Sequence, residues 1–457
     1  MKVVVFGTGK IYKKNRYKLL GMQIVAFLDN NVEKQGKILD DAEIISPQSI
    51  NTVHYDYVVL MSYYYKEMRH QLLELGVEES RILDREHKGH FAGITSRHCY
   101  DVMERSEGKK KVALISHELS LTGAPIILHT LAKLLKKNGY WVEYISKGDG
   151  ELKFEILRSE ITLNIFEDYS FSENEVRHYF EKYDIIIINT VTLYNLVDRL
   201  QILGKPIVWW LHEGITSYPR YNICQNDLRP RDNVYIYGVS NKVMQEFCMN
   251  AKHELIKRLM WGIEKKDCKV KRRIRSNQKI IFAVIGNVSD RKGQDIFVDV
   301  VNSNWEDWKS IAEFWIVGSI TDDKRREFEK YKTVRIMGMK EHTELLEMYD
   351  EMDVIVCPSR DEPLSIVVVE GMMKRKPCIV SDMTGISEFI IPMENGLICK
   401  TGSRQSLRES IQWFIEHKEN LENMEECAYQ TYEREFTLEK FENRILKLID
   451  GLGKSDV

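Results

Sequence analysis

Two glutamates, Glu362 and Glu370, stand in the stretch of this sequence whose residue types point most directly to chemistry. They belong to the segment D-E-P-L-S-I-V-V-V-E, which follows an apolar run that closes at Pro358-Ser359. The apolar run predicts a buried strand and residues 366–373 predict a helix, so Glu362 falls on a loop and Glu370 within the helix. This spacing suits one carboxylate that reaches a sugar and another that holds a ribose.

The start of the predicted helix is a second chemical feature, because its first backbone N–H groups have no partner inside the helix. The N–H groups of Leu364, Ser365 and Ile366 lie there and suit a bound diphosphate. A further apolar run, 377–380, predicts the next buried strand. The segment is therefore a strand–loop–helix–strand unit of a doubly wound sheet, in which ligands bind at the carboxyl ends of the strands.

This segment resembles the nucleotide-sugar-binding signature of retaining glycosyltransferases of the GT-B fold, in particular family four, also described as group one. The family pattern is Pro-Ser, a few residues, E-x-x-G and then a second glutamate; here Ser365 stands where the family usually has glycine. The resemblance covers residues 110–445. It implies an α/β fold with two Rossmann-like domains facing a cleft, in which Glu362 contacts the donor sugar and Glu370 holds the donor ribose.

The loop after the predicted strand 280–285 carries two cations. Its residues Gly286, Asn287, Arg291 and Lys292 resemble the family's G-R and K-G pattern, with Asn287 in place of the usual arginine. A lysine in such a loop suits the charge that develops on a leaving diphosphate. Arg291 would replace the missing cation, or the clamp is weaker; the alternative is that Lys292 is a plain surface lysine. The resemblance assigns base recognition to the backbone of Met337, Gly338 and Met339.

In the first half of the resemblance, His212 follows the apolar run 206–211, at the end of a predicted strand where ligands bind. It resembles the family's cleft histidine, which contacts the donor sugar; the alternative is a purely structural histidine. Glu213 would contact the acceptor or orient His212. The turn at Gly123 lets backbone approach a ligand closely and resembles the family's glycine-rich first loop, unless it is an ordinary strand–helix turn.

Residues 1–90 predict a small additional Rossmann-like domain. Gly7-Thr8-Gly9 follows a predicted strand, but Tyr12 occupies the third glycine position of the dinucleotide fingerprint, and Asp29 stands where a ribose-binding acid would lie. The domain is either a nucleotide or nucleotide-sugar sensor or a vestigial domain used for packing and protein contacts. The predicted organisation of the chain is an accessory domain (1–90), a linker (91–110), an acceptor domain (111–265), a donor domain (276–435) and a C-terminal helix returning to the acceptor domain (436–457).

The composition of the chain limits the class of protein and the kinds of ligand to be expected. The chain has 457 residues, 43% hydrophobic and 30% charged, which is typical of globular proteins with two or three domains, and its net charge of −3 gives no general attraction to nucleic acid. Eight scattered cysteines without a C-x-x-C pair, and no signal peptide, favour a cytoplasmic protein with reduced thiols. His87, His90, His98 and Cys99 match no standard zinc spacing, and no D-x-D motif offers a metal-held diphosphate, so neither a metal site nor a cofactor beyond the donor is expected.

The partners implied by the resemblance are a UDP- or GDP-linked sugar and a glycan or lipid-linked acceptor, in cell-surface polysaccharide biosynthesis. The basic residues between Lys269 and Arg275 are either a solvated linker or a patch for anionic lipid at the inner face of the membrane. Two other functional classes stay open. One is another GT-B enzyme, such as a sugar-nucleotide epimerase, and the other is a catalytically silent partner of a transferase.

Overall fold

The structure is a computed structural model that describes residues 2–9, 11–12, 19, 22–62, 64–83, 97–100, 108–166, 169, 171–221, 223, 231–251, 256–266, 279–330 and 332–452. The chain divides into two compact units. The first comprises residues 1–104, 118–121 and 144–169, and the second comprises the remainder. Among the described residues, no helix combines the length and the apolar character that crossing a bilayer requires.

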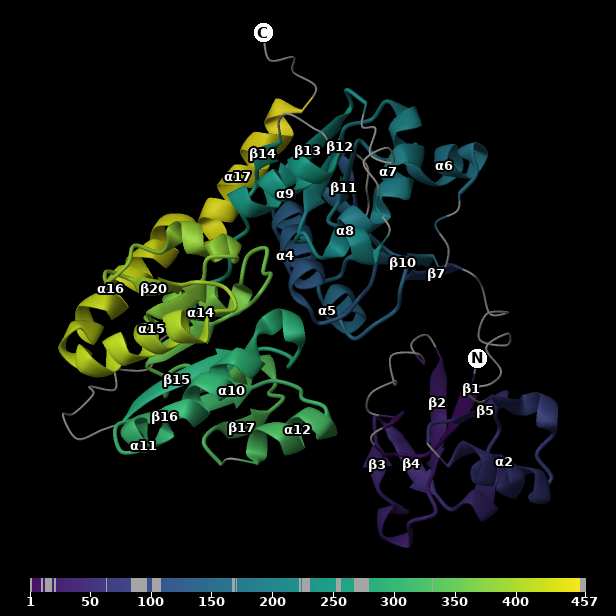
Figure 1. Cartoon of the computed structure of the whole chain (residues 1–457). Helices are drawn as coiled ribbons and strands as arrows, with labels where there is room; N and C mark the ends of the chain where they lie inside the picture. The colour runs from purple at the N-terminus through teal and green to yellow at the C-terminus, as the bar shows by residue number, and fades with distance from the viewer. Residues whose placement is uncertain are drawn as a thin grey trace. The chain divides into compact units, whose positions relative to one another are not determined.

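The first unit contains a six-stranded sheet in the order β3-β4-β2-β1-β5-β6, parallel except for the β3–β4 pair (Figure 1). The apolar side chains of β1 and β5 are buried on both faces of this sheet. Because β1 lies between β2 and β5, the sheet is Rossmann-like, as predicted. Its elements are β1 (Lys2–Phe6), β2 (Gln23–Leu28), β3 (Ile38–Leu39), β4 (Ala42–Ile45), β5 (Tyr57–Leu60), α2 (Tyr65–Glu74) and β6 (Ile82–Leu83).

A second pairing in the first unit falls inside the predicted linker. Strand β7 (Arg97–Tyr100) pairs antiparallel with β10 (Thr162–Phe166), and α5 (Lys153–Arg158) precedes β10. The linker prediction was therefore wrong for these four residues. The polar composition of the stretch concealed this strand, because strand formation depends on pairing with a neighbour as well as on local composition.

The second unit contains two lobes. The first lobe is built on the strand order β14-β13-β12-β11-β8-β9, in which the pairs from β14 to β8 are parallel. The run of four isoleucines in β11 is completely buried, as expected for a central parallel strand. Its elements are β8 (Lys111–Ser116), α4 (Gly123–Lys137), β9 (Trp141–Ser146), α6 (Glu173–Phe180), β11 (Ile185–Ile188), α7 (Tyr194–Leu200), β12 (Ile207–Leu211), α8 (Ser217–Arg220), β13 (Val234–Gly238), α9 (Asn241–Ala251) and β14 (Lys257–Arg258).

The second lobe is a parallel sheet in the order β17-β16-β15-β18-β19-β20. Both sheets thus give the doubly wound α/β architecture that the sequence predicted. The elements are β15 (Ile280–Ile285), α10 (Gln294–Ser303), α11 (Trp305–Trp308), β16 (Ala312–Val317), α12 (Asp322–Glu329), β17 (Arg335–Gly338), α13 (His342–Met348), β18 (Val354–Cys357), α14 (Ile366–Met373), β19 (Cys378–Ser381), β20 (Gly396–Cys399), α15 (Arg404–Glu416) and α16 (Leu421–Glu435).

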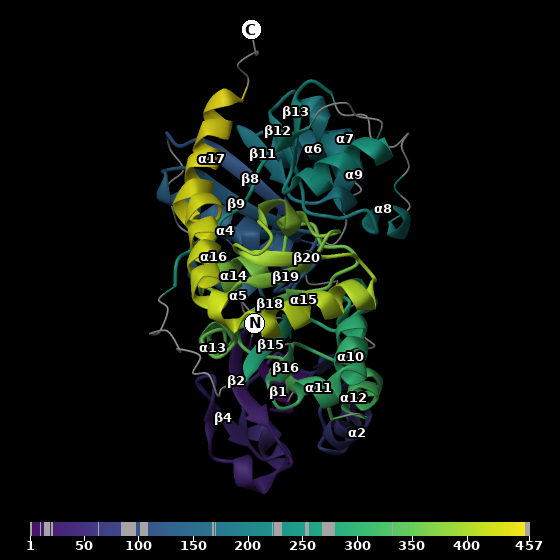
Figure 2. The ribbon, with the colours of Figure 1, turned by 60° about the vertical axis from the view of Figure 1, so that its left-hand side comes forward.

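The last helix, α17 (Leu438–Gly451), contacts the first lobe (Figure 2). Its Phe441 ring lies 5.6 Å from the Trp210 ring of β12, and its Glu442 accepts from Lys137 of α4 at 2.9 Å. Beside it the chain crosses between the lobes a first time, where the backbone N–H of Ile263 donates to Phe436 at 2.8 Å. Two chain segments therefore join the lobes side by side.

Candidate functional site

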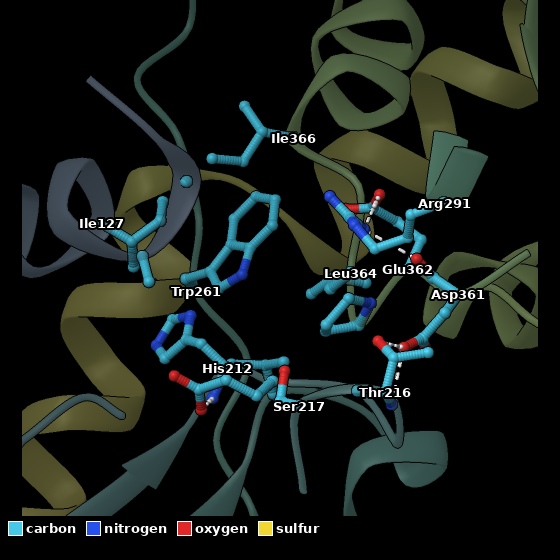
Figure 3. Close-up of a pocket in the computed structure, with 16 residues that line it drawn as sticks. Ile127, His212, Thr216, Ser217, Trp261, Arg291, Asp361, Glu362, Leu364 and Ile366 are labelled. Atoms are coloured by element: carbon cyan, nitrogen blue, oxygen red, sulfur yellow. Dashed lines mark hydrogen bonds and ion pairs between the residues drawn. The ribbon is translucent and has the colours of Figure 1, made fainter. Parts of the chain in front are cut away.

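A cavity of about 250 Å³ opens between the two lobes of the second unit. The first lobe lines it with the start of α4, the loop after β12 and Trp261, and the second lobe with Arg291 and the loop from β18 to α14 (Figure 3). All of these second-lobe residues and the β12 loop lie at carboxyl ends of parallel strands. Parallel sheets concentrate ligand-binding loops at that edge, so the position is the one expected for a ligand site.

Glu362 is the charged centre of the cavity. One of its carboxylate oxygens accepts from Lys292 Nζ at 2.6 Å and from Arg291 Nη1 at 2.9 Å. Burial alone would raise the pKa of Glu362, but the nearby charges of Lys292 and Arg291 outweigh it and hold the pKa below its usual value. The site therefore carries two cations gathered around one ionised carboxylate.

His212 faces the cavity from the other lobe. Its ring packs edge-on against Trp210, with ring centres 4.4 Å apart, and its Nε2 is buried without a hydrogen-bond partner among the described residues. Burial lowers the pKa of His212 to about 3, so the imidazole is neutral at physiological pH. A neutral ring with an unused nitrogen can donate or accept one hydrogen bond to a ligand.

Glu213 lines the cavity, and its carboxylate accepts hydrogen bonds from backbone N–H groups. Its Oε2 accepts from the N–H groups of Val191 at 2.9 Å and His212 at 3.1 Å. Burial raises the pKa of Glu213 in spite of these hydrogen bonds. The residue thus fixes the backbone that carries His212.

Three neighbouring strands of the second lobe end in glycines with left-handed backbone. Gly286 follows β15 with φ of 134°, Gly318 follows β16 with φ of 148°, and Gly338 ends β17 with φ of 71°. A side chain at Gly318 would collide with the backbone of Gly286. Bare backbone therefore lines this edge of the sheet, which would let a ligand approach closely. The side chain of Lys292 lies over Gly286, so the lysine that pairs with Glu362 is close to the same edge.

Glu370 on α14 is buried, and both of its oxygens have partners. His342 Nε2 lies 2.7 Å from one oxygen and the Tyr349 hydroxyl lies 3.0 Å from the other. The hydrogen bond to Glu370 raises the pKa of His342. His342 itself is largely exposed at the start of α13, so a ligand that approaches Glu370 meets His342 first.

Comparison with solved structures gives the fold a name. The Anabaena protein HepE in complex with UDP and glucose superposes with a TM-score of 0.62 at 18% identity, over 75% of this chain and all of that one. WaaG, a glycosyltransferase involved in lipopolysaccharide biosynthesis, gives 0.59 at 13% identity over 74% of this chain and all of that one. At these identities the likeness shows a shared GT-B fold.

Family models decide the membership. Residues 265–431 match the family described as glycosyl transferases group 1, and residues 108–258 match glycosyl-transferase family 4. The chain belongs to the GT-B glycosyltransferases. Residues 1–83 of this GT-B protein match a third model, described as C2185-like, N-terminal.

Curated relatives match over shorter stretches. An uncharacterised glycosyltransferase of Methanocaldococcus jannaschii is 25% identical over 169 residues, which is 37% of this chain and 47% of the relative. The lipopolysaccharide core biosynthesis mannosyltransferase LpsB of Rhizobium meliloti is 23% identical over 183 residues, or 38% and 52%. The chain thus spans about half the length of these curated relatives.

The cavity of the GT-B protein gathers seven of the fifteen residues predicted to form the site, from four segments of the chain. They are Gly123, His212, Glu213, Arg291, Glu362, Leu364 and Ile366. The other eight do not line this cavity. They are Gly286, Asn287, Lys292, Met337, Gly338, Met339, Ser365 and Glu370. Of these, Asn287 is exposed, and its neighbour in the loop, Arg291, reaches Glu362 instead.

Trp261, Thr216 and Asp361 are among the cavity residues that sequence reasoning missed. Trp261 is buried beside the segment that joins the lobes, Thr216 follows the His212 loop, and Asp361 precedes Glu362. Only the position of Asp361, next to a predicted site residue, offered a signal. Trp261 and Thr216 stand in no motif, and long-range packing alone brings them to the cavity.

Other predicted features lie elsewhere. In the first unit, Asp29 is already paired, because Lys34 Nζ and the Thr8 hydroxyl donate to its carboxylate. Burial opposes the charge of Asp29, but these hydrogen bonds outweigh it and lower the pKa of Asp29. His87, His90 and the basic run from Lys269 to Arg275 lie outside the described residues. Within the described part of the chain, no group of three or more metal-ligating side chains is assembled.

Proposed function

We propose that this GT-B protein is a retaining, metal-independent glycosyltransferase that moves a hexose from a nucleotide diphosphate sugar to a glycan or lipid-linked acceptor. The observation that carries the proposal is Glu362, which lines the cavity together with His212 of the other lobe and is paired with Lys292 and Arg291. Two cations beside the start of α14 suit a leaving diphosphate, and a neutral histidine opposite them suits a sugar hydroxyl.

In the proposed reaction the bond between the sugar C1 and the diphosphate oxygen breaks, and a bond from C1 to the acceptor hydroxyl oxygen forms on the same face. The acceptor proton passes to the departing phosphate oxygen. Lys292, Arg291 and the first N–H groups of α14 stabilise the negative charge that grows on the diphosphate. Glu362 contacts the sugar hydroxyls, His212 bonds the sugar near C1, and closure of the two lobes excludes water.

The nucleotide is proposed to lie along the glycine-lined ends of β15, β16 and β17. Gly286, Gly338 and the backbone of Met337 and Met339 would contact the nucleoside, and Glu370 would accept from the ribose hydroxyls. The solved complexes of HepE contain UDP and UDP-glucose, which makes a UDP-sugar the first donor to test. No cofactor besides the donor is required by this scheme.

The class of acceptor is proposed from the relatives. LpsB is named for lipopolysaccharide core biosynthesis and WaaG for lipopolysaccharide biosynthesis. A cell-surface polysaccharide or its lipid-linked precursor, glycosylated on the cytoplasmic side, is therefore the acceptor we propose for this chain.

A catalytically silent partner of a transferase is the second candidate. Two observations favour it: Ser365 in place of glycine at the start of α14, where it is almost completely buried, and Asn287 in place of arginine. A donor that binds without ever being consumed would identify such a partner.

The test uses the purified full chain and a panel of UDP-, GDP- and ADP-sugars, with nucleotide release and thermal shift as readouts. We expect one nucleotide to stabilise the protein and its sugar to be hydrolysed slowly without acceptor, and Glu362→Gln to abolish release while keeping the shift. A shift without release, even with glycan acceptors present, would overturn the transferase proposal in favour of the silent partner. Absence of both would overturn nucleotide-sugar binding itself.

A further inference from the structure

The geometry points to Asp361 as a positioning residue that fastens the two lobes together across the cavity and thereby fixes the position of its neighbour Glu362. The catalytic consequence rests on the proposed transferase function, whereas the fastening itself does not. Asp361 belongs to the second lobe, on the loop from β18 to α14, yet the partners of its carboxylate all belong to the first lobe.

The contacts of Asp361 are short and shielded from water. Lys242 Nζ of α9 donates to one carboxylate oxygen at 2.6 Å, and the hydroxyl and backbone N–H of Thr216 donate to the other at 2.6 and 3.2 Å (Figure 3 shows the pair with Thr216). Only 3% of the Asp361 side chain is exposed. Burial opposes its charge, but Lys242 and Thr216 outweigh it and lower the pKa of Asp361, so the carboxylate is ionised.

Gly214 shows that the first lobe leaves a space for this carboxylate. A Cβ atom built on Gly214 would overlap both carboxylate oxygens of Asp361. The backbone of Gly214 is not left-handed, so alanine would be tolerated there were it not for Asp361. The glycine is therefore explained by the contact between the lobes.

The fastening can also be released. Lys242 Nζ lies 2.6 Å from Glu246 Oε1, one turn further along α9, so the lysine keeps a partner when Asp361 moves away. Stranding an unpaired charge in a buried site is what makes most such pairs costly to break. A second carboxylate on the same helix removes much of that cost for Lys242, and water can solvate Asp361 in an open cleft.

The backbone around Glu362 is held on both sides. The carbonyl of Asp361 accepts from Arg291 Nη1 at 2.7 Å, and the same nitrogen donates to Glu362 at 2.9 Å. On the far side, the Ser240 hydroxyl of the first lobe donates to the carbonyl of Pro363 at 2.7 Å. Closing the lobes thus clamps residues 361–363, and Glu362 and Arg291 are placed as a consequence.

The first experiment is a double-mutant cycle on Asp361→Asn and Lys242→Met, with kcat for donor consumption and Kd for the free nucleotide measured separately. We expect each variant to lower kcat by about tenfold or more and to change Kd by less than about twofold, since the nucleotide contacts lie in the second lobe. The double variant should be no slower than the single ones. The matched control is Asp295→Asn, which removes an ion pair to Arg360 inside the second lobe and should leave kcat within about twofold.

A second cycle needs no change of charge. Gly214→Ala alone should lower kcat as Asp361→Asn does, because the new methyl group displaces the carboxylate. On an Asp361→Ala background the same substitution should have no effect, because the space is then free. Additive losses from Gly214→Ala and Asp361→Ala would overturn the assignment, as would a loss in kcat that merely follows a fall in Tm.

Small-angle X-ray scattering tests the fastening independently of catalysis. Asp361→Asn and Gly214→Ala should increase the radius of gyration of the nucleotide-free protein relative to wild type and Asp295→Asn. Unchanged scattering would overturn the fastening even if the variants were slow. Expanded variants of a protein that consumes no donor would confirm the fastening and overturn only the proposed transferase function.

Discussion

The two lobes present opposite electrostatic characters to the same cavity. The first lobe contributes His212, which burial keeps neutral. It also contributes Glu213, whose pKa is raised by burial and whose carboxylate accepts a hydrogen bond from the backbone. The second lobe contributes Glu362 between Lys292 and Arg291, all charged. Both lobes have the same doubly wound topology, so the fold does not impose this difference.

The difference indicates a division of labour. Charge gathered on the second lobe suits the diphosphate of a donor, because fixed cations in a shielded site stabilise developing negative charge. The neutral imidazole of His212 on the first lobe suits a sugar or acceptor hydroxyl, which needs a hydrogen bond but no counter-charge. Four variants test this contrast.

The largest effect is expected for Lys292→Met. Without Lys292 the proposed diphosphate site loses one of its two cations, and kcat/KM should fall by about 100-fold or more. The measurement is nucleotide release at limiting donor. Lys309→Met, at an exposed lysine paired with Glu306, is the matched control. Equal activity of the two variants would contradict a charged donor side.

A smaller loss is expected for His212→Asn, about 30-fold in kcat, the size of one hydrogen bond lost in a buried site. Because burial lowers the pKa of His212 to about 3, its imidazole is neutral from mildly acidic to basic pH. The pH profiles of wild type and variant should therefore run parallel between about pH 5 and 8. A rise or fall of kcat with pH that is present in the wild type and absent in the variant would show that His212 titrates in this range.

Arg291→Met should lower kcat/KM by about tenfold, because Lys292 remains as a cation beside the diphosphate. This variant also tests whether Arg291 takes the place of the arginine that the family usually has at position 287. If it does, Asn287→Arg should change little in the wild type and recover part of the loss in Arg291→Met. If Asn287→Arg recovers no activity in Arg291→Met, positions 287 and 291 act on different parts of the donor.

The smallest effect concerns His342, whose pKa is raised by its hydrogen bond to Glu370. The ion pair is fully formed below about pH 6.5 and is lost as pH rises through the raised pKa of His342. The ribose that we propose for Glu370 would compete with His342, so nucleotide affinity should rise by about fivefold across that window. Calorimetric titration should show this rise in wild type and in the surface control His70→Asn, but a flat profile in His342→Asn. A pH-dependent affinity in all three proteins would contradict the proposed contact between Glu370 and the ribose.

Much of this organisation was predictable from local patterns. Uninterrupted apolar runs such as 185–188 and 280–285 predicted the buried strands, since a parallel strand covered on both faces needs apolar side chains throughout. Motif spacing around Glu362, Lys292 and His212 predicted residues at strand ends, and parallel topology then brings strand ends to one edge. The doubly wound α/β architecture follows from these features, whereas the GT-B assignment came from the resemblance of the motifs to a known family.

Tertiary structure decided which charges meet. Asp361 and Lys242 are 119 positions apart, and His342 reaches Glu370 over 28. Trp261 enters the cavity from a segment that carries no motif. Spacing along the chain encodes the period of a helix or strand, whereas a hydrogen bond depends on distances of a fraction of an ångström between separate elements. The sequence therefore determined the two lobes and their reactive edges, and only packing determined that Asp361 would join them.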